Sequence, residues 1–124
     1  MPVLTAPASP THELSATKFT SLATPRRGVT DTSVWVVEIA PGTPGTPHEV
    51  TREEIFVVLS GQALVQLSGV EASAGPGDAI VVPANTPFAL SASGTAPLRA
   101  LCCLPVGGQA RLPDGNTFTP PWAE

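Results

Sequence analysis

The sequence has no tyrosine and only one lysine, Lys18, among its 124 residues. The missing tyrosine excludes every proton-transfer scheme that needs a phenol, and a lone lysine in the N-terminal segment argues against Schiff-base catalysis. Charged residues make up only 13% of the chain, and the net charge is −4. The six basic residues are scattered except for Arg26 and Arg27. Without a cluster of positive charge, no nucleic-acid partner is expected.

Long apolar runs and secretion signals are missing as well. No stretch reaches the roughly 18 apolar residues that a membrane span needs, and "MPVLTAPASP" lacks the basic and apolar regions of a signal peptide. The only two cysteines, Cys102 and Cys103, are adjacent. Neighbours on a strand point to opposite faces, so a disulfide between them has poor geometry. We therefore expect reduced thiols, a cytoplasmic location and no membrane partner.

Proline and glycine are plentiful, with 15 and 11 residues, while 42% of the chain is apolar. This combination favours short strands joined by tight turns, in a single domain. Short apolar or β-branched runs indeed recur about every ten residues, between turn residues. The expected strands are 34–40, 54–60, 62–68, 71–74, 78–82, 87–93 and 98–104. The pattern predicts an all-β sandwich or barrel.

The two ends of the chain differ from this middle part. Residues 1–12 are rich in Pro, Ala, Ser and Thr, and we predict that they form a flexible N-terminal arm. The barrel is predicted over 13–104, with a first edge strand within 13–23. The proline-rich tail 105–124 is predicted to be extended. We expect Phe118 and Trp122 to pin this tail to the barrel surface or to a partner subunit.

One motif combines a histidine and a glutamate with flanking glycines. Five residues separate Gly42 from His48, five separate His48 from Glu54, and six separate Glu54 from Gly61. A second motif follows, in which Gly77 is separated by five residues from Pro83. Asn85 then stands where a glycine would be expected, and asparagine also tolerates a left-handed turn.

These motifs, over residues 34–104, resemble those of the cupins in their small single-domain form. The resemblance implies a jelly-roll β-barrel, that is, a double-stranded β-helix, and a homodimer. Cupins usually hold a divalent metal with three histidines and one glutamate. This chain keeps His48 and Glu54 but has Val50 and Phe88 at the other two positions. Divalent metals generally need three or more protein ligands, so the motif is degenerate and no cofactor is expected.

A metal is not favoured, but if one were bound, His48 and Glu54 would be its ligands. The sequence leaves open three donors that could complete such a site: His12, Cys102 and Cys103.

Alternation along 54–60 places Glu54 with Phe56 and Val58 on the barrel interior, and His48 shares that interior. Ile55, Val57 and Leu59 then form an outer apolar face, which another sheet or subunit is expected to bury. Small residues such as Ala63 and Ala100 favour some space inside the barrel. We predict a pocket in which His48 and Glu54 act as the catalytic acid/base pair. Its substrate-binding walls are predicted to be Val50, Phe56 and Phe88.

Three functions remain open. The first is a metal-independent isomerase, cyclase or lyase that transfers protons on a small apolar or aromatic metabolite. The second is a non-catalytic small-molecule binding or accessory protein, which would use the same pocket. The third is a metal-dependent oxygenase with a non-standard ligand set.

Overall fold

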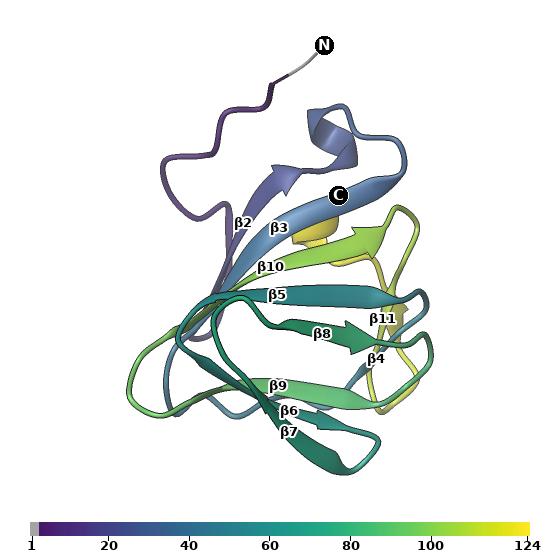
Figure 1. Ribbon diagram of the computed structural model, residues 1–124. Helices are drawn as coiled ribbons and strands as arrows, with labels where there is room; N and C mark the ends of the chain where they lie inside the picture. Colours follow the sequence, from purple (N-terminus) through teal and green to yellow (C-terminus); the bar gives the residue numbers. More distant parts are fainter. Residues whose placement is uncertain (1–2) are drawn as a thin grey trace.

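Strands account for almost all of the regular structure in residues 3–124, the part of the chain that this computed structural model describes (Figure 1). The strands are β1 (His12–Leu14), β2 (Thr17–Ala23), β3 (Thr32–Ile39), β4 (Glu49–Val50), β5 (Glu54–Ser60), β6 (Gln62–Leu67), β7 (Val70–Ala74), β8 (Ala79–Val82), β9 (Phe88–Ser93), β10 (Leu98–Pro105), β11 (Ala110–Arg111) and β12 (Thr117–Phe118). Two single turns of 3₁₀ helix complete the list: η1 (Pro25–Arg27) and η2 (Pro121–Ala123).

The strands form an antiparallel jelly-roll barrel, as the sequence predicts. A six-stranded sheet has the order β1-β2-β3-β10-β5-β8, and a three-stranded sheet has the order β7-β6-β9. A small third sheet, β12-β11-β4, joins the tail to the body of the barrel. Figure 1 shows the sheets curving around a common interior. Within residues 3–124, no helix is long and apolar enough to cross a membrane.

Strand β5 has one inner and one outer face. Glu54, Phe56 and Val58 are buried, which confirms the predicted alternation. Outward-facing Ile55 and Val57 are half-buried, whereas Leu59 is 45% exposed. No second sheet of the described chain packs on this outer face, so the expected cover from within the chain is wrong (Figure 1). The other cover that the sequence analysis allows for this outer face is a partner subunit.

Several local features differ from the sequence-based expectations. The predicted edge strand 13–23 is a hairpin of β1 and β2, because Ser15 adopts a left-handed conformation at φ 54° and turns the chain. The two-residue strand β4 was not predicted, since two residues carry no periodicity. Asn85 does adopt the expected left-handed turn, at φ 59°.

The tail packs against the barrel and lines its cavity. Buried Ser21 and Ser33 each donate a 2.7 Å hydrogen bond from Oγ, to the carbonyl oxygens of Trp122 and Ala123 respectively. The Trp122 ring stacks on Phe19, with ring centroids 3.6 Å apart and planes within 5° of parallel. These contacts make the tail part of the interior wall.

Candidate active site

A cavity of about 240 Å³ lies inside the barrel, between the β1–β2–β3 side of the large sheet, strand β9 and the C-terminal tail. Its lining includes every aromatic residue of the chain, which has two tryptophans, four phenylalanines and no tyrosine. These residues are Phe19, Trp35, Phe56, Phe88, Phe118 and Trp122. Leu14 also lines the cavity and is 61% exposed, so the opening to solvent lies beside β1.

Glu54 is the one acidic side chain in this lining. It begins β5 opposite Val82 of β8 and faces inward, with only 5% of its surface exposed. Its carboxyl makes no hydrogen bond or ion pair with any residue in the described range 3–124. Burial among apolar groups raises the pKa of Glu54 to about 8, because the charged form loses its hydration. The carboxyl is therefore mostly protonated at neutral pH.

His48 lies on the other polar part of the lining, held by both its backbone and its ring. Its backbone exchanges two hydrogen bonds with Phe88, of 3.0 and 2.9 Å. The ring centroids of His48 and Phe88 are 4.3 Å apart. Nδ1 lies 2.8 Å from the carbonyl oxygen of Thr46. A carbonyl only accepts hydrogen bonds, so Nδ1 carries the proton in this contact. Nε2 is then the ring nitrogen that is left outside this contact.

The structure brings His48 and Glu54 to one cavity, but no hydrogen bond joins them in the described chain. His48 bonds to Thr46 instead, because the neighbouring backbone carbonyl is within reach of its ring.

Two predicted wall residues, Phe56 and Phe88, line the cavity, with ring centroids 6.0 Å apart. Val50 does not line it, which corrects the predicted wall. Val50 is 2% exposed and belongs to the packed core, because β4 is held against β11 at this point. Ala63 and Ala100 are fully buried and are also absent from the lining. The cavity instead lies on the side of the barrel that the C-terminal tail lines.

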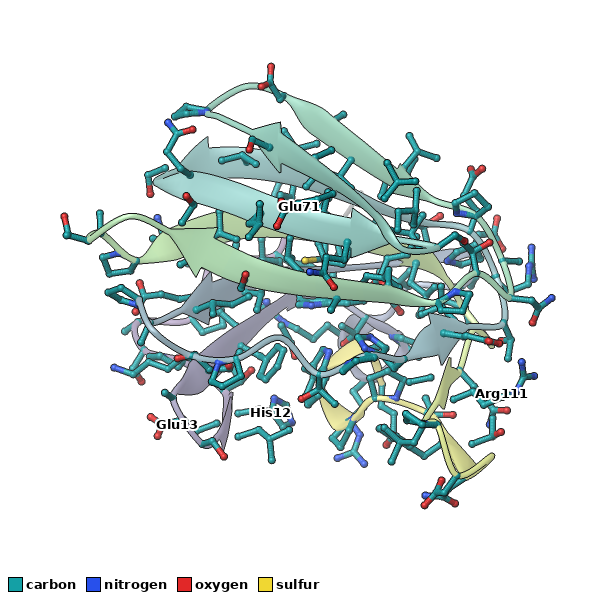
Figure 2. All side chains as sticks on the ribbon, turned by 90° about the horizontal axis from the view of Figure 1, so that it is seen from below. His12, Glu13, Glu71 and Arg111 are labelled. Atoms are coloured by element: carbon teal, nitrogen blue, oxygen red, sulfur yellow. The ribbon has the colours of Figure 1, made fainter. Side chains whose placement is uncertain are left out.

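The residues present do not fit the metal site of the family. Of the four ligand positions, Val50 and Phe88 carry apolar side chains that are buried in the core. Nowhere in residues 3–124 do three or more His, Cys, Asp or Glu side chains gather in a way that could hold a metal ion. His12 lies on β1 at the margin of the barrel (Figure 2) and is not in the cavity lining.

The two cysteines are free and lie on opposite faces of β10, as expected. Cys102 is fully buried, and burial followed by the nearby Glu54 carboxyl raises the pKa of its thiol well above the usual value. Such a thiol stays protonated and does not line the cavity. Cys103 is half-buried on the outer face. Neither thiol can serve as a nucleophile that His48 activates.

The cavity lining contains no lysine or arginine. Arg111 lies at the edge of the molecule in Figure 2, where its guanidinium donates to Glu49 at 3.0 Å and to Asn85 at 3.2 Å. Arg99 is exposed beside Glu38, at 3.5 Å. The interior therefore offers aromatic faces, a carboxyl and an imidazole, but no cation.

Sequence reasoning missed the share that the tail has in this site. Ala110, Leu112, Phe118 and Trp122 all line the cavity. A usable signal was present, since the tail holds two of the six aromatic residues of a chain poor in aromatics. The sequence predicts only that these two pin the tail to the barrel surface or to a partner subunit, because an extended, proline-rich segment has no periodicity that shows which side is buried.

A family model described as "Cupin domain" matches residues 35–104, which is more than half of the chain. The chain belongs to the cupin family. This agrees with the resemblance of its two motifs and with the jelly-roll topology.

Among curated proteins, the cupin is similar to an uncharacterized protein of Methanocaldococcus jannaschii, with 38% identity over 53 residues. That match covers 43% of this chain and 42% of the relative, so the cupin aligns with less than half of its length.

Two solved structures share the fold. The vicilin of Solanum melongena matches with a TM-score of 0.71 and 19% identity, over 85% of this chain and 32% of the vicilin chain. The polyketide cyclase RemF of Streptomyces resistomycificus matches with a TM-score of 0.67 and 24% identity, over 82% of this chain and 73% of the cyclase.

Proposed function

We propose that this cupin transfers protons on a small, mainly apolar or aromatic metabolite without a resident metal, as an isomerase, cyclase or lyase. One observation carries the proposal: a base and a buried acid line the same aromatic cavity. Nδ1 of His48 donates to the Thr46 carbonyl, which leaves Nε2 as the ring nitrogen that could accept a proton. Burial raises the pKa of Glu54 to about 8, so its carboxyl holds a proton at neutral pH.

The size of the cavity supports a small substrate. A cavity of about 150 Å³ accommodates benzene in a protein core, and this one measures about 240 Å³. A substituted benzene or a small bicyclic molecule would fill it. A fold shared with a polyketide cyclase is compatible with this class of substrate.

The proposed step is proton transfer at a carbon next to a polarised group. His48 Nε2 takes the proton from that carbon, and the C–H electron pair forms a new double bond. Glu54 gives its proton to the oxygen or nitrogen atom that receives electrons. In an isomerase, His48 returns the proton to a different carbon while the enol proton goes back to Glu54. In a cyclase, the enol carbon attacks a second carbonyl of the same molecule, whose oxygen takes the proton from His48 while the enol proton returns to Glu54. In a lyase, the C–H electron pair expels a group from the adjacent carbon, and Glu54 protonates that leaving group.

Deuterium uptake tests this step without knowledge of the natural substrate. Acetophenone is incubated with the protein in heavy water near neutral pH, and NMR follows exchange of the methyl protons beside the carbonyl. The protein should accelerate exchange over buffer, and Glu54→Gln and His48→Gln should each reduce the acceleration about 100-fold, as general acid–base catalysis implies. Exchange in the native protein should fall above pH 8, where Glu54 ionises.

Each variant has a matched control on the same chain. Glu53→Gln changes the exposed neighbour of Glu54, and His12→Gln changes the histidine outside the cavity. Both controls should leave exchange unchanged. Exchange equal to that of buffer, although acetophenone binds, would sink the catalytic proposal.

That outcome would favour the second candidate, a non-catalytic binding or accessory protein. The observation in its favour is that no hydrogen bond joins His48 and Glu54 in the described chain. A catalytic imidazole is usually oriented by a carboxylate, whereas here only a backbone carbonyl holds it. The oxygenase reading has no such support, because the donor set does not fit a metal.

We also propose a homodimer through the outer face of the six-stranded sheet. Strand pairing places Val57 beside Leu101 and Ile55 beside Cys103 and Val81, so apolar side chains form neighbouring rows on this face. Val81 is 49% exposed in the single chain. Charged residues, among them Glu38 and Arg99, lie at the end of these rows. An apolar centre with a polar rim is typical of subunit interfaces.

A further inference from the structure

We propose that the cavity binds a small organic cation, an aromatic or alkyl amine or amidine, with the Glu54 carboxylate as its counter-ion. The inference rests on the proposed function, because it takes the same cavity as the substrate site and names the substrate class. Two independent observations carry it: the placement of the aromatic residues, and a buried carboxyl that has no partner within the described chain.

The aromatic residues are concentrated to an unusual degree. All six aromatic residues of the chain line this one cavity. Aliphatic side chains would make an apolar pocket equally well, so a need for hydrophobic contact alone does not account for the choice. Aromatic faces carry partial negative charge and attract cations, by about 0.5–2 kcal/mol for each well-placed ring. A box of aromatic rings therefore prefers a cation over an uncharged ligand of the same shape.

The unpartnered carboxyl points to the same ligand class. Glu54 is only 5% exposed, lines the cavity and makes no hydrogen bond or ion pair with residues 3–124, and its carboxyl oxygens are not fully enclosed by protein. A buried carboxyl without a partner destabilises a protein, and no arginine or lysine of the lining offsets that cost. A bound cation would supply the missing partner. An anion would enter a cavity that holds no positive group and would lie beside the carboxyl.

Proton balance is consistent with the proposed chemistry. In the free protein the Glu54 carboxyl is protonated at neutral pH. An alkyl amine or an amidine is a cation at neutral pH, so its binding expels the Glu54 proton to the buffer and leaves an ion pair with the carboxylate. In that complex the ligand cation carries the proton, whereas Glu54 supplies it to an uncharged substrate.

Three probes of nearly identical size and shape separate the ligand classes: benzamidine, acetophenone and benzoate. The first is a cation, the second is neutral and the third is an anion, and all three have the same number of non-hydrogen atoms. Affinities are measured by calorimetry at pH 7. Quenching of tryptophan fluorescence gives a second readout, because both tryptophans of the chain, Trp35 and Trp122, line the cavity.

We expect benzamidine to bind at least about 10-fold more tightly than acetophenone, with benzoate weakest. Glu54→Gln should abolish this preference, whereas Glu53→Gln should retain it. Benzamidine titrations in buffers of different ionisation enthalpy should reveal close to one proton released per ligand bound. Acetophenone or benzoate binding as tightly as benzamidine to the native protein would overturn the inference, even if Glu54→Gln failed to fold.

The acetophenone exchange test and the benzamidine binding test can fail independently of each other. If exchange of acetophenone protons is accelerated while benzamidine has no advantage, the proposed proton transfer stands and the cation class falls. If benzamidine is preferred through Glu54 while exchange equals that of buffer, the cation site stands and the enzyme proposal falls.

Discussion

The inner and outer faces of the same sheet are made by alternate residues of the same strands, yet they have opposite chemical characters. On β5, Glu54 and Phe56 face the cavity, while Ile55 and Val57 face outward. On β10, Cys102 is fully buried, while its neighbour Cys103 is half-buried on the outside. The inner face encloses a lone carboxyl among aromatic rings. The outer face is apolar and open in the single chain.

This difference shows that context, and not residue type, sets the chemistry. Glu53 and Glu54 are the same residue one position apart, but only Glu54 is buried, and burial raises its pKa to about 8. A shift of that size turns an ordinary carboxylate into a proton donor at neutral pH. A strand reverses the direction of the side chain at every residue, so a single step along β5 separates a surface charge from a candidate catalytic group.

The largest expected effect comes from placing a charge on each face in turn. Val58→Asp buries a carboxylate at a position that is 1% exposed, and we expect the free energy of unfolding to fall by at least about 4 kcal/mol. Val57→Asp on the outer face should cost the single chain less than about 1 kcal/mol. Urea denaturation of dilute protein measures both values. Equal costs for the two variants would contradict the assignment of the faces.

The same pair of variants tests the homodimer. Sedimentation analysis should show the native protein as a dimer and Val57→Asp as a folded monomer. A native protein that sediments as a monomer at high concentration would remove the outer face from consideration as an interface.

A second, smaller effect concerns pH. The pKa of Glu54 is raised from 4.5 to about 8 in the folded protein, so the folded state keeps a proton that the unfolded state has lost. Its stabilising contribution is complete below pH 4.5 and declines by about 1.4 kcal/mol per pH unit until pH 8. Glu54→Gln should therefore reduce the fall in stability between pH 5.5 and 7.5 by roughly 3 kcal/mol. Glu53→Gln should keep the native slope.

Denaturation at a series of pH values measures these slopes. A Glu54→Gln variant whose stability depends on pH as steeply as that of the native protein would show that the carboxyl already ionises in the fold.

The third effect is kinetic and compares the two cysteines. Burial raises the pKa of both thiols, but Cys102 is fully buried and Cys103 is partly accessible. We expect a thiol-specific reagent to modify Cys103 at least about 100-fold faster than Cys102 in dilute folded protein, since Cys102 reacts only after local opening. The variants Cys102→Ser and Cys103→Ser assign the two rates. Similar rates in both variants would place β10 in a different register.

The all-β class could be predicted because strand alternation and turn residues are local features, whereas the jelly-roll topology was implied by the resemblance of the two motifs to those of the cupins. The alternation from Glu54 to Leu59 and the motif spacing around His48 specified the interior of the barrel. Turn residues marked the strand boundaries, and Asn85 was expected in a left-handed turn because it stands at the glycine position of the second motif. These features depend only on neighbouring residues, so a single sequence is enough to predict them.

The cavity could not be predicted in the same way, because it depends on which segments meet. Val50 and Phe88 have the same apolar character in the sequence, yet only Phe88 lines the cavity. Trp122 reaches it because Ser21 and Ser33 hold the tail from strands about a hundred residues away. The pKa of Glu54 is raised because the segments that meet around it bury its carboxyl. Long-range placement of this kind has no local pattern.

The most direct test of the account is a titration of the Glu54 carboxyl itself. Carbon-13 labelling of glutamate side-chain carboxyls, with Glu54→Gln to assign the signal, follows its ionisation by NMR in the free protein. We predict a titration midpoint near pH 8, because burial disfavours the charged carboxylate, and a fall in that midpoint when benzamidine is bound. A midpoint near 4.5 in the free protein would show an ordinary solvated carboxylate, and the proton-donor role of Glu54 would have to be abandoned.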